Sequence, residues 1–267
     1  MVFKALPLVA CLLTLAAFGA LAQTPGTVFL DELTWTELRD QIRSGKTTII
    51  VPIGGTEQNG PHMVLGKHNV RVKALAEKIA RALGNALVAP VIAYVPEGAI
   101  SPPAGHMRFP GTISVPSATF EEVLESAARS FKAHGFRDIV FLGDHSGYQA
   151  SEKVVADRLN RQWASTPARA HAVPEYYRVT VTRYPQALKS RGYSEQEIGT
   201  HAGLADTSLS LAIDPSLVRT DRLQSVPAAA AGVYGDPRRS SAELGQLGVD
   251  AVVAQTVEAI KLATARR

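Results

Sequence analysis

The chain is poor in cysteine. Its 267 residues include only one, Cys11, which lies in an apolar N-terminal stretch. Removal of that stretch would leave a protein with no disulfide, no thiolate nucleophile and no cysteine ligand for a metal. Stability must then come from a hydrophobic core, which a chain of this length with 46% hydrophobic residues can build.

Long runs of one charge, heptad repeats and low-complexity tracts are also missing. The formal net charge is +4, and lysine and arginine are spread along the chain. Such a distribution argues against a nucleic-acid-binding surface and favours a small-molecule substrate. The composition also excludes disorder, coiled coil and collagen, so we expect one globular domain.

The first 22 residues are typical of a secretory signal peptide. Lys4 is their only charge, a mostly apolar run spans 5–21, and the Ala-Leu-Ala at 20–22 fits a cleavage site. We therefore predict a mature domain at 23–267, located in the periplasm or secreted, with no membrane span left after cleavage. Two alternatives stay open. A transmembrane anchor would need a longer run, and a lipoprotein attached through Cys11 would normally end its apolar run there.

Strand patterns alternate with helix patterns along the chain. Thr34 can cap a helix, with Glu37 three residues on, as in a capping box. The expected helices are 34–44, 70–83, 119–134, 152–163 and 240–265, and the expected strands are 47–53, 86–94, 138–142 and 168–173. This order predicts an α/β fold, a three-layer α/β/α sandwich around a mostly parallel sheet. Sites in such folds form beyond the carboxyl ends of the strands.

Five of the seven histidines fall in polar loop segments, several of them at the expected strand ends. They are His62, His68, His106, His145 and His201. Carboxylates accompany them at Glu57, Asp144 and Asp206. Imidazole and carboxylate together suit zinc, manganese or iron(II), so the clustering favours a divalent metal site. A serine triad is disfavoured, because His145 stands where a G-x-S-x-G elbow needs its serine.

Residues 51–62, VPIGGTEQNGPH, resemble the signature of the creatininase family, P-x-G-[ST]-x-E-Q-H-G-P-H. Four later segments agree with that family in order and spacing. They are HMRFPGT at 106–112, GDHSG at 143–147, HAGLADTS at 201–208 and GVYGDP at 232–237. The resemblance implies an α/β/α fold, hydrolysis of C–N bonds in cyclic or linear amides, one or two divalent metals at the strand ends, and a homo-oligomer.

The matched segments depart from the family at the metal-binding positions. Glu57 and His145 match a glutamate and a histidine ligand of the family. Asn59 stands in place of another histidine ligand, His68 in place of a bridging aspartate, and Asp206 in place of a glutamate. A carboxylate can bridge two cations through its two oxygens, whereas a neutral imidazole offers one lone pair. The family's two-metal centre is therefore hard to build in this chain.

We predict one divalent cation per chain, bound by Glu57, His68 and His145, with Asp206 as a further ligand. Two histidines and one carboxylate leave coordination positions open for water and substrate.

The resemblance gives His201 an acid–base role at the leaving nitrogen, and Asp144 can orient a neighbouring ligand. Asn59, His62 and His106 are candidates for the pocket wall, with a structural loop anchor as the alternative for His62.

Three functional hypotheses remain after the sequence is read. The first is a metal-dependent amidohydrolase. The second is a lactonase or other esterase that uses the same chemistry, since sequence does not separate an amide from an ester substrate. The third is a binding protein that has kept the fold and lost the metal, which the residues at Asn59 and His68 motivate.

Overall fold

The structure is a computed structural model that describes residues 26–226 and 232–265. The expected signal peptide at 1–22, Cys11 and the start of the mature domain at residue 23 lie outside these residues. Within them, no helix combines the length and apolar character needed to cross a membrane.

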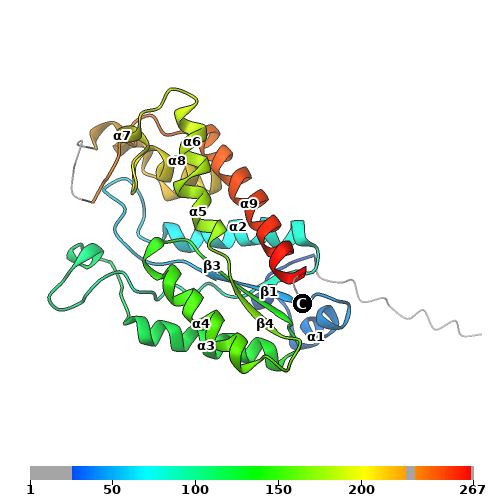
Figure 1. Ribbon diagram of the computed structural model, residues 1–267. Coiled ribbons are helices and arrows are strands. Elements are labelled where there is room, and N and C mark those ends of the chain that lie inside the picture. The colour runs from blue at the N-terminus through cyan, green and yellow to red at the C-terminus, as the bar shows by residue number, and fades with distance from the viewer. Residues whose placement is uncertain (1–25, 227–231, 266–267) are drawn as a thin grey trace, which may run out of the picture.

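A parallel four-stranded sheet forms the centre of the molecule (Figure 1). Its strands run in the order β2, β1, β3, β4, and every neighbouring pair is parallel. The strand bounds are β1 Thr48–Ile53, β2 Ala86–Val88, β3 Asp138–Gly143 and β4 Arg169–Ala172. Both central strands are buried along their whole length, as expected for a parallel sheet covered on both faces.

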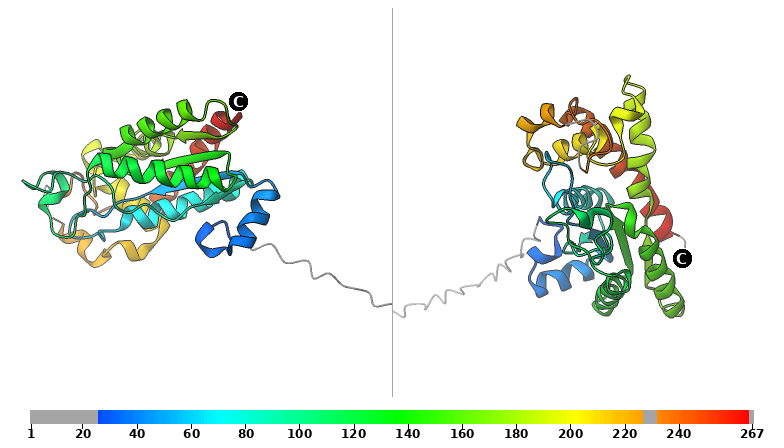
Figure 2. Two further views of the ribbon diagram at one scale, coloured as in Figure 1. Left: turned by 90° about the horizontal axis from the view of Figure 1, so that it is seen from below. Right: turned by 90° about the vertical axis from the view of Figure 1, so that its left-hand side faces the viewer.

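Helices cover the two faces of this sheet and complete three layers (Figures 1 and 2). Ile49 and Val51 of β1 point to one face, against Phe120 and Leu124 of α3. Ile50 points to the other face, where α2, α5, α8 and α9 supply the core. Successive side chains of a strand alternate between faces, so one strand feeds both cores. The predicted α/β/α architecture is confirmed.

The described helices are long on both sides of the sheet and short near its carboxyl end. Their bounds are α1 Trp35–Arg43, α2 Lys67–Leu83, α3 Ser117–Ala133, α4 Gln149–Gln162, α5 Glu175–Val181, α6 Arg183–Lys189, α7 Glu195–Ile198, α8 Leu204–Ile213 and α9 Ala242–Ala265. Short 3₁₀ turns are η1 Leu30–Glu32, η2 Gly105–Arg108, η3 Ser146–Tyr148, η4 Pro215–Leu217 and η5 Thr220–Ser225. The helices α6, α7 and α8 gather at the end of the molecule remote from α1 (Figure 1).

Local signals explain where several elements begin and end. The capping box of α1 is present, because the Thr34 hydroxyl accepts from the Glu37 N–H and the Glu37 carboxylate accepts from the Thr34 N–H. The second strand is shorter than predicted and ends at Val88, two residues before Pro90, which has no N–H to donate. Pairing resumes only as an isolated bridge between Ile53 and Ile92.

The start of one helix differs from the sequence-based expectation. Helix α2 begins at Lys67, three residues earlier than predicted, so His68 lies in its first turn rather than in the preceding loop. A glycine sets the packing of another helix. A Cβ on Gly245 of α9 would lie 1.9 Å from the carbonyl oxygen of Ser208, so glycine allows α9 to pack directly on α8.

Candidate metal centre

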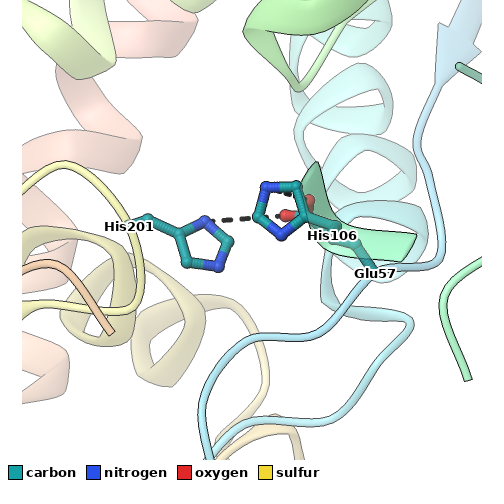
Figure 3. A group of neighbouring side chains, drawn as sticks. All are labelled: Glu57, His106 and His201. Atoms are coloured by element: carbon teal, nitrogen blue, oxygen red, sulfur yellow. Dashed lines mark ion pairs between the residues drawn. The ribbon is translucent and has the colours of Figure 1, made fainter. Parts of the chain in front are cut away.

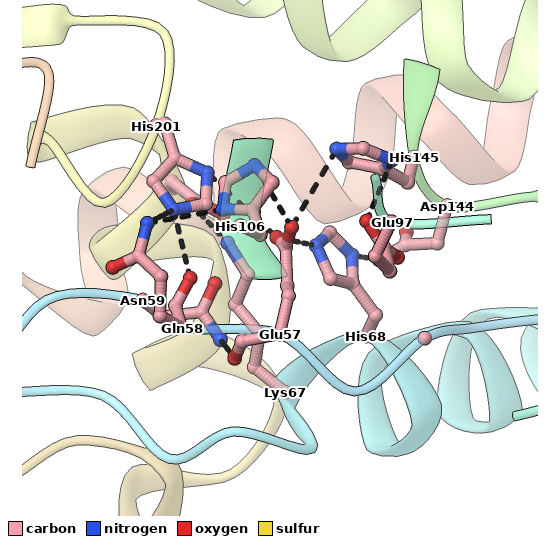
Figure 4. Close-up of polar contacts among 12 residues, drawn as sticks. Glu57, Gln58, Asn59, Lys67, His68, Glu97, His106, Asp144, His145 and His201 are labelled. Carbon is pink, nitrogen blue, oxygen red and sulfur yellow. Dashed lines mark hydrogen bonds and ion pairs between the residues drawn. The ribbon is translucent and has the colours of Figure 1, made fainter. Parts of the chain in front are cut away.

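Loops and helix ends from five parts of the chain meet beyond the carboxyl ends of β1 and β3. Glu57 follows β1, and His145 follows β3. His106 comes from η2, His68 from the first turn of α2, and His201 from the loop before α8. Figures 3 and 4 show how these side chains converge. The structure therefore places four of the five loop histidines of the sequence around one carboxylate.

Glu57 lies at the centre of this group and is fully buried. Its Oε1 lies 2.8 Å from Nε2 of His68 and 3.7 Å from Nδ1 of His201. Its Oε2 lies 3.1 Å from Nε2 of His106 and 3.7 Å from Nε2 of His145. Despite these neighbours, Oε2 has no partner in hydrogen-bond geometry among the described residues. One carboxylate oxygen is thus available for another ligand.

Charges and burial keep the central carboxylate ionised and three of the imidazoles neutral. Burial by itself would raise the pKa of Glu57, but the hydrogen bond from His68 and the charges around it hold that pKa below its ordinary value. Burial lowers the pKa of His145 to about 3 and that of His201 to about 4, and it also lowers the pKa of His106. A neutral imidazole keeps a lone pair for a metal.

His68 lies between two carboxylates. Its Nδ1 is 2.6 Å from Oδ2 of Asp144, and its Nε2 is 2.8 Å from Oε1 of Glu57. Asp144 also accepts hydrogen bonds from the guanidinium of Arg71 and from the hydroxyl of Tyr176. With both ring nitrogens directed at carboxylates, His68 has no lone pair directed at a cation in this arrangement. Its predicted role as a ligand stays a prediction, and its contacts fit a residue that positions Glu57.

Asp206 contacts two cationic side chains. Its Oδ2 pairs with the ammonium of the buried Lys67, and its Oδ1 lies 2.6 Å from Nη1 of Arg71. Its Oδ2 also accepts the backbone N–H of Ala202. Burial would raise the pKa of Asp206, but Lys67 and Arg71 hold it well below the ordinary value. The predicted ligand role of Asp206 is untested, and both of its oxygens are already engaged.

Two pocket candidates of the sequence serve the loop that follows β1. The amide of Asn59 donates to the backbone oxygens of Glu57 and Val64. Nε2 of His62 lies 3.0 Å from the hydroxyl of Thr207 on α8. Both side chains are fully buried, and neither lines the cavity as the described residues define it. His106, the third candidate, does line it.

Glu97 is a site residue that the sequence reasoning missed. It lies in the proline-rich loop beyond β2, is 4% exposed, and has no hydrogen-bond partner on either carboxyl oxygen among the described residues. Burial first, and then the charge of Glu57, raise its pKa to about 9. It matches none of the five family-like segments. Its position after a strand of the same sheet was the one signal that could have identified it.

Two groups of described residues have ligand atoms close enough to bind one cation. The first is Glu57, His106 and His201, and the second is Glu57, Glu97 and His145. Within each group the ligand atoms lie within 4.8 Å of one another. Both groups depend on Glu57, and neither contains His68 or Asp206.

A cavity of about 660 Å³ opens beside this centre. His106, His145 and His201 line its inner end, together with Lys67 and Asp206. Its outer end reaches the short helices α5, α6 and α7. A volume in this range accommodates a small-molecule ligand of substantial size.

The ion pairs of Asp206 give a test that separates a structural role from a ligand role. We expect Asp206→Asn to destabilise the fold by roughly 3 kcal/mol, because it leaves the buried Lys67 without a counter-charge and removes one of the two carboxylates that pair with Arg71. The free energy of unfolding in urea measures this loss. Metal content per folded chain should stay at the parent level. Loss of metal with unchanged stability would instead establish Asp206 as a ligand.

Comparisons with known proteins assign the chain to a family. The profile of the Creatininase family, described as "Creatinine amidohydrolase", matches residues 31–260. The creatinine amidohydrolase of Pseudomonas putida is 28% identical over 261 residues, which cover 88% of this chain and 96% of that protein. A mycofactocin precursor peptide peptidase of Mycolicibacterium smegmatis is 29% identical over 237 residues, 79% of this chain and 83% of that protein.

Solved structures give the same result. A mutant creatininase described as "Zn-Zn type" superposes with a TM-score of 0.72 at 27% identity, covering 90% of this chain and 99% of that one. The match of the family profile extends over most of the sequence and includes the loops that carry Glu57, Glu97, His106, His145 and His201. The chain therefore belongs to the creatininase family and is an enzyme of the amidohydrolase type.

Proposed function

We propose that this enzyme uses a divalent cation to hydrolyse the C–N bond of a cyclic or linear amide. The observation that carries the proposal is the buried Glu57, which has three neutral imidazoles around it and an unpartnered oxygen. The relatives support the reaction class, since one is named for creatinine, a cyclic amide, and another for a peptide, a linear one.

The residues at this centre fit a divalent cation. Oε2 of Glu57 and both carboxyl oxygens of Glu97 are buried without a hydrogen-bond partner among the described residues. Buried polar atoms of this kind call for an explanation, and an ion is one of them. Carboxylate oxygens with imidazole nitrogens suit zinc, manganese or iron(II). Because both candidate ligand groups share Glu57, we propose one cation per chain.

The chain's own residues divide the remaining tasks. A bound divalent cation supplies a Lewis acid that polarises the amide carbonyl and lowers the pKa of water. His201 lines the cavity and can carry a proton to the leaving nitrogen, the acid–base role that the family resemblance gave it. Asp144 fixes His68, and His68 in turn fixes Glu57 through a 2.8 Å contact.

Export and assembly complete the proposal. The apolar stretch at 5–21 and the Ala-Leu-Ala at 20–22 support a cleaved signal and a periplasmic or secreted enzyme. The expected N-terminus of the exported chain is Gln23, which mass spectrometry of a periplasmic fraction checks. An intact N-terminus at Met1 or a lipid on Cys11 would contradict it. Homo-oligomerisation, common in the family, is proposed for this chain as well.

The reaction is tested with metal content and a substrate panel of lactams, lactones and formamides. We expect about one cation per chain, hydrolysis of at least one amide, loss of activity on chelation, and recovery with zinc or manganese. His201→Ala should lower kcat by roughly 10²–10⁴-fold. His134→Ala is the matched control, because His134 lies at the end of α3, away from the site, and should have no effect.

Three results would overturn the proposal. Activity that survives complete removal of metal would exclude a metal-dependent reaction. Turnover of lactones with no turnover of any amide would show an esterase instead. A bound cation with no hydrolysis of any class would favour a binding protein.

A further inference from the structure

We propose that the catalytic cation binds between Glu57, Glu97 and His145, so that Glu97 is a metal ligand. The inference rests on the proposed function and selects one of the two candidate groups that share Glu57. Figure 4 shows Glu97 and His145 on one side of Glu57 and His201 on the other. Because the two groups share only Glu57, substitution of Glu97 and substitution of His106 have different expected effects on metal binding.

Three unpaired carboxyl oxygens belong to the group that contains Glu97. Both carboxyl oxygens of Glu97 and Oε2 of Glu57 are buried and have no hydrogen-bond partner among the described residues. Leaving a buried polar atom unpaired is unfavourable, and more so for a charged group. Glu57, Glu97 and His145 each offer one ligand atom within 4.8 Å of the other two, which indicates a position for a cation.

The charge distribution also favours this group. Asp144 pairs with Arg71, and Asp206 pairs with Lys67 and Arg71. Across the described residues, no lysine or arginine forms a salt bridge with Glu57 or Glu97. Two carboxylates attract a divalent cation more strongly than the one carboxylate of the other group.

The local backbone is shaped to bring Glu97 to this position. Gly55 has a φ of +150°, and a Cβ on it would lie 2.5 Å from Oε1 of Glu97. Only glycine both adopts that backbone conformation readily and leaves room for the carboxyl group. On the other side, the hydroxyl of Ser114 accepts the backbone N–H of Glu97 at 3.0 Å.

The residues of the other group are held for contact with the cavity. The side-chain amide nitrogen of Gln58 lies 3.1 Å from Nδ1 of His106 and 3.1 Å from Nε2 of His201. The same His201 nitrogen lies 3.0 Å from the backbone oxygen of Gln58. Both imidazoles line the cavity, as His145 does, whereas Glu57 and Glu97 are not among its lining residues. The rings of His106 and His201 are therefore placed to meet the substrate, with the cation held beside them at His145.

The experiment is a zinc titration of the full chain in competition with a chromophoric chelator. Glu97→Gln should weaken zinc affinity by at least about tenfold, the lower bound for groups that merely support a ligand. Glu152→Gln is the matched control. Glu152 is also a buried carboxyl, 1% exposed, with an unpartnered Oε1, and it lies outside both groups. Glu152→Gln and His106→Ala should both bind zinc as the parent does.

The outcomes separate this inference from the proposed function. If Glu97→Gln keeps parental affinity and His106→Ala loses it, the cation belongs to the other group and the inference is wrong. If Glu97→Gln and His106→Ala both keep it, Glu97 is not a ligand and only shares a proton with Glu57. If the parent binds no zinc, manganese or iron(II), the proposed function itself fails. Should Glu97→Gln not fold, Glu97→Asp replaces it, with the same expected loss.

A second inference concerns the outer half of the cavity and rests on different residues. The inner half is lined by imidazoles and charged groups. The part formed by α5, α6 and α7 carries Tyr177, Val181, Tyr184 and Ile198, with Thr180, Lys189 and Glu195 as its polar residues. Val181 is 51% exposed, so its apolar side chain is open to a ligand. We infer that this half binds a bulky apolar group of the amide substrate.

Size supports the same conclusion. A cavity of about 660 Å³ is far larger than a small unsubstituted ring needs, and pockets of this size bury drug-sized ligands. Val181 closes α5, next to α6, at the solvent side of the cavity. An apolar substituent placed there would cover surface that otherwise contacts water.

The test compares two cyclic amides, hydantoin and 5-benzylhydantoin, as ligands in calorimetric titrations of the metal-loaded enzyme. The parent should bind the benzyl compound at least about tenfold more tightly, and Val181→Asp should remove that preference. Val154→Asp is the matched control, because Val154 is 45% exposed on α4 and does not line the cavity. Equal affinity of the parent for the two compounds, or a preference that survives Val181→Asp, overturns the inference.

Discussion

The architecture of this site depends on one requirement, that buried carboxylates at the carboxyl end of a parallel sheet be compensated by positive charge. Glu57, Glu97, Asp144 and Asp206 are all largely withdrawn from water. An isolated carboxylate in such a position is strongly disfavoured unless it is paired, protonated or bound to a cation. The rest of the centre can be understood from how each of these four is compensated.

Helix α2 supplies most of the compensation. Lys67, His68 and Arg71 all lie in its first turn and the turn that follows. Residues three or four apart on a helix share a face, so His68 and Arg71 can both reach Asp144. Lys67 and Arg71 together neutralise Asp206. The early start of α2 at Lys67 is therefore part of the site, because a helix that began at residue 70 would not hold these three side chains in register.

The sequence predicted the sheet and the long helices well but not the short helices between β4 and α9, for physical reasons. Strands β1 and β3 are continuous β-branched or apolar runs, buried on both faces, and helix α1 has a capping box, so periodicity and caps identified them. The helices α5, α6 and α7 have seven, seven and four residues. Such short helices owe their stability to packing rather than to their own pattern, so a local pattern does not reveal them.

The site shows the same division. Motif spacing predicted that Glu57, His106, His145 and His201 belong to one site, and the structure shows that these side chains lie together. Motif spacing could not show that Arg71 and Lys67 would form ion pairs with Asp206, or that a carboxyl from the loop beyond β2 would approach Glu57. Those facts depend on which side chains face each other across three segments distant in the chain. Sequence spacing predicts such long-range contacts only where a known motif includes both residues.

The charge count supports our proposal that this site binds one divalent cation. The site has four buried carboxylates and two permanent cations, Lys67 and Arg71. When all four carboxylates are ionised, the two permanent cations leave two negative charges, and one divalent cation supplies a matching charge. A second divalent cation would leave two uncompensated positive charges in a region shielded from water, which is as unfavourable as uncompensated carboxylates. The lysine and arginine of α2 thus add a second reason, beside the residues Asn59 and His68, for proposing one metal per chain.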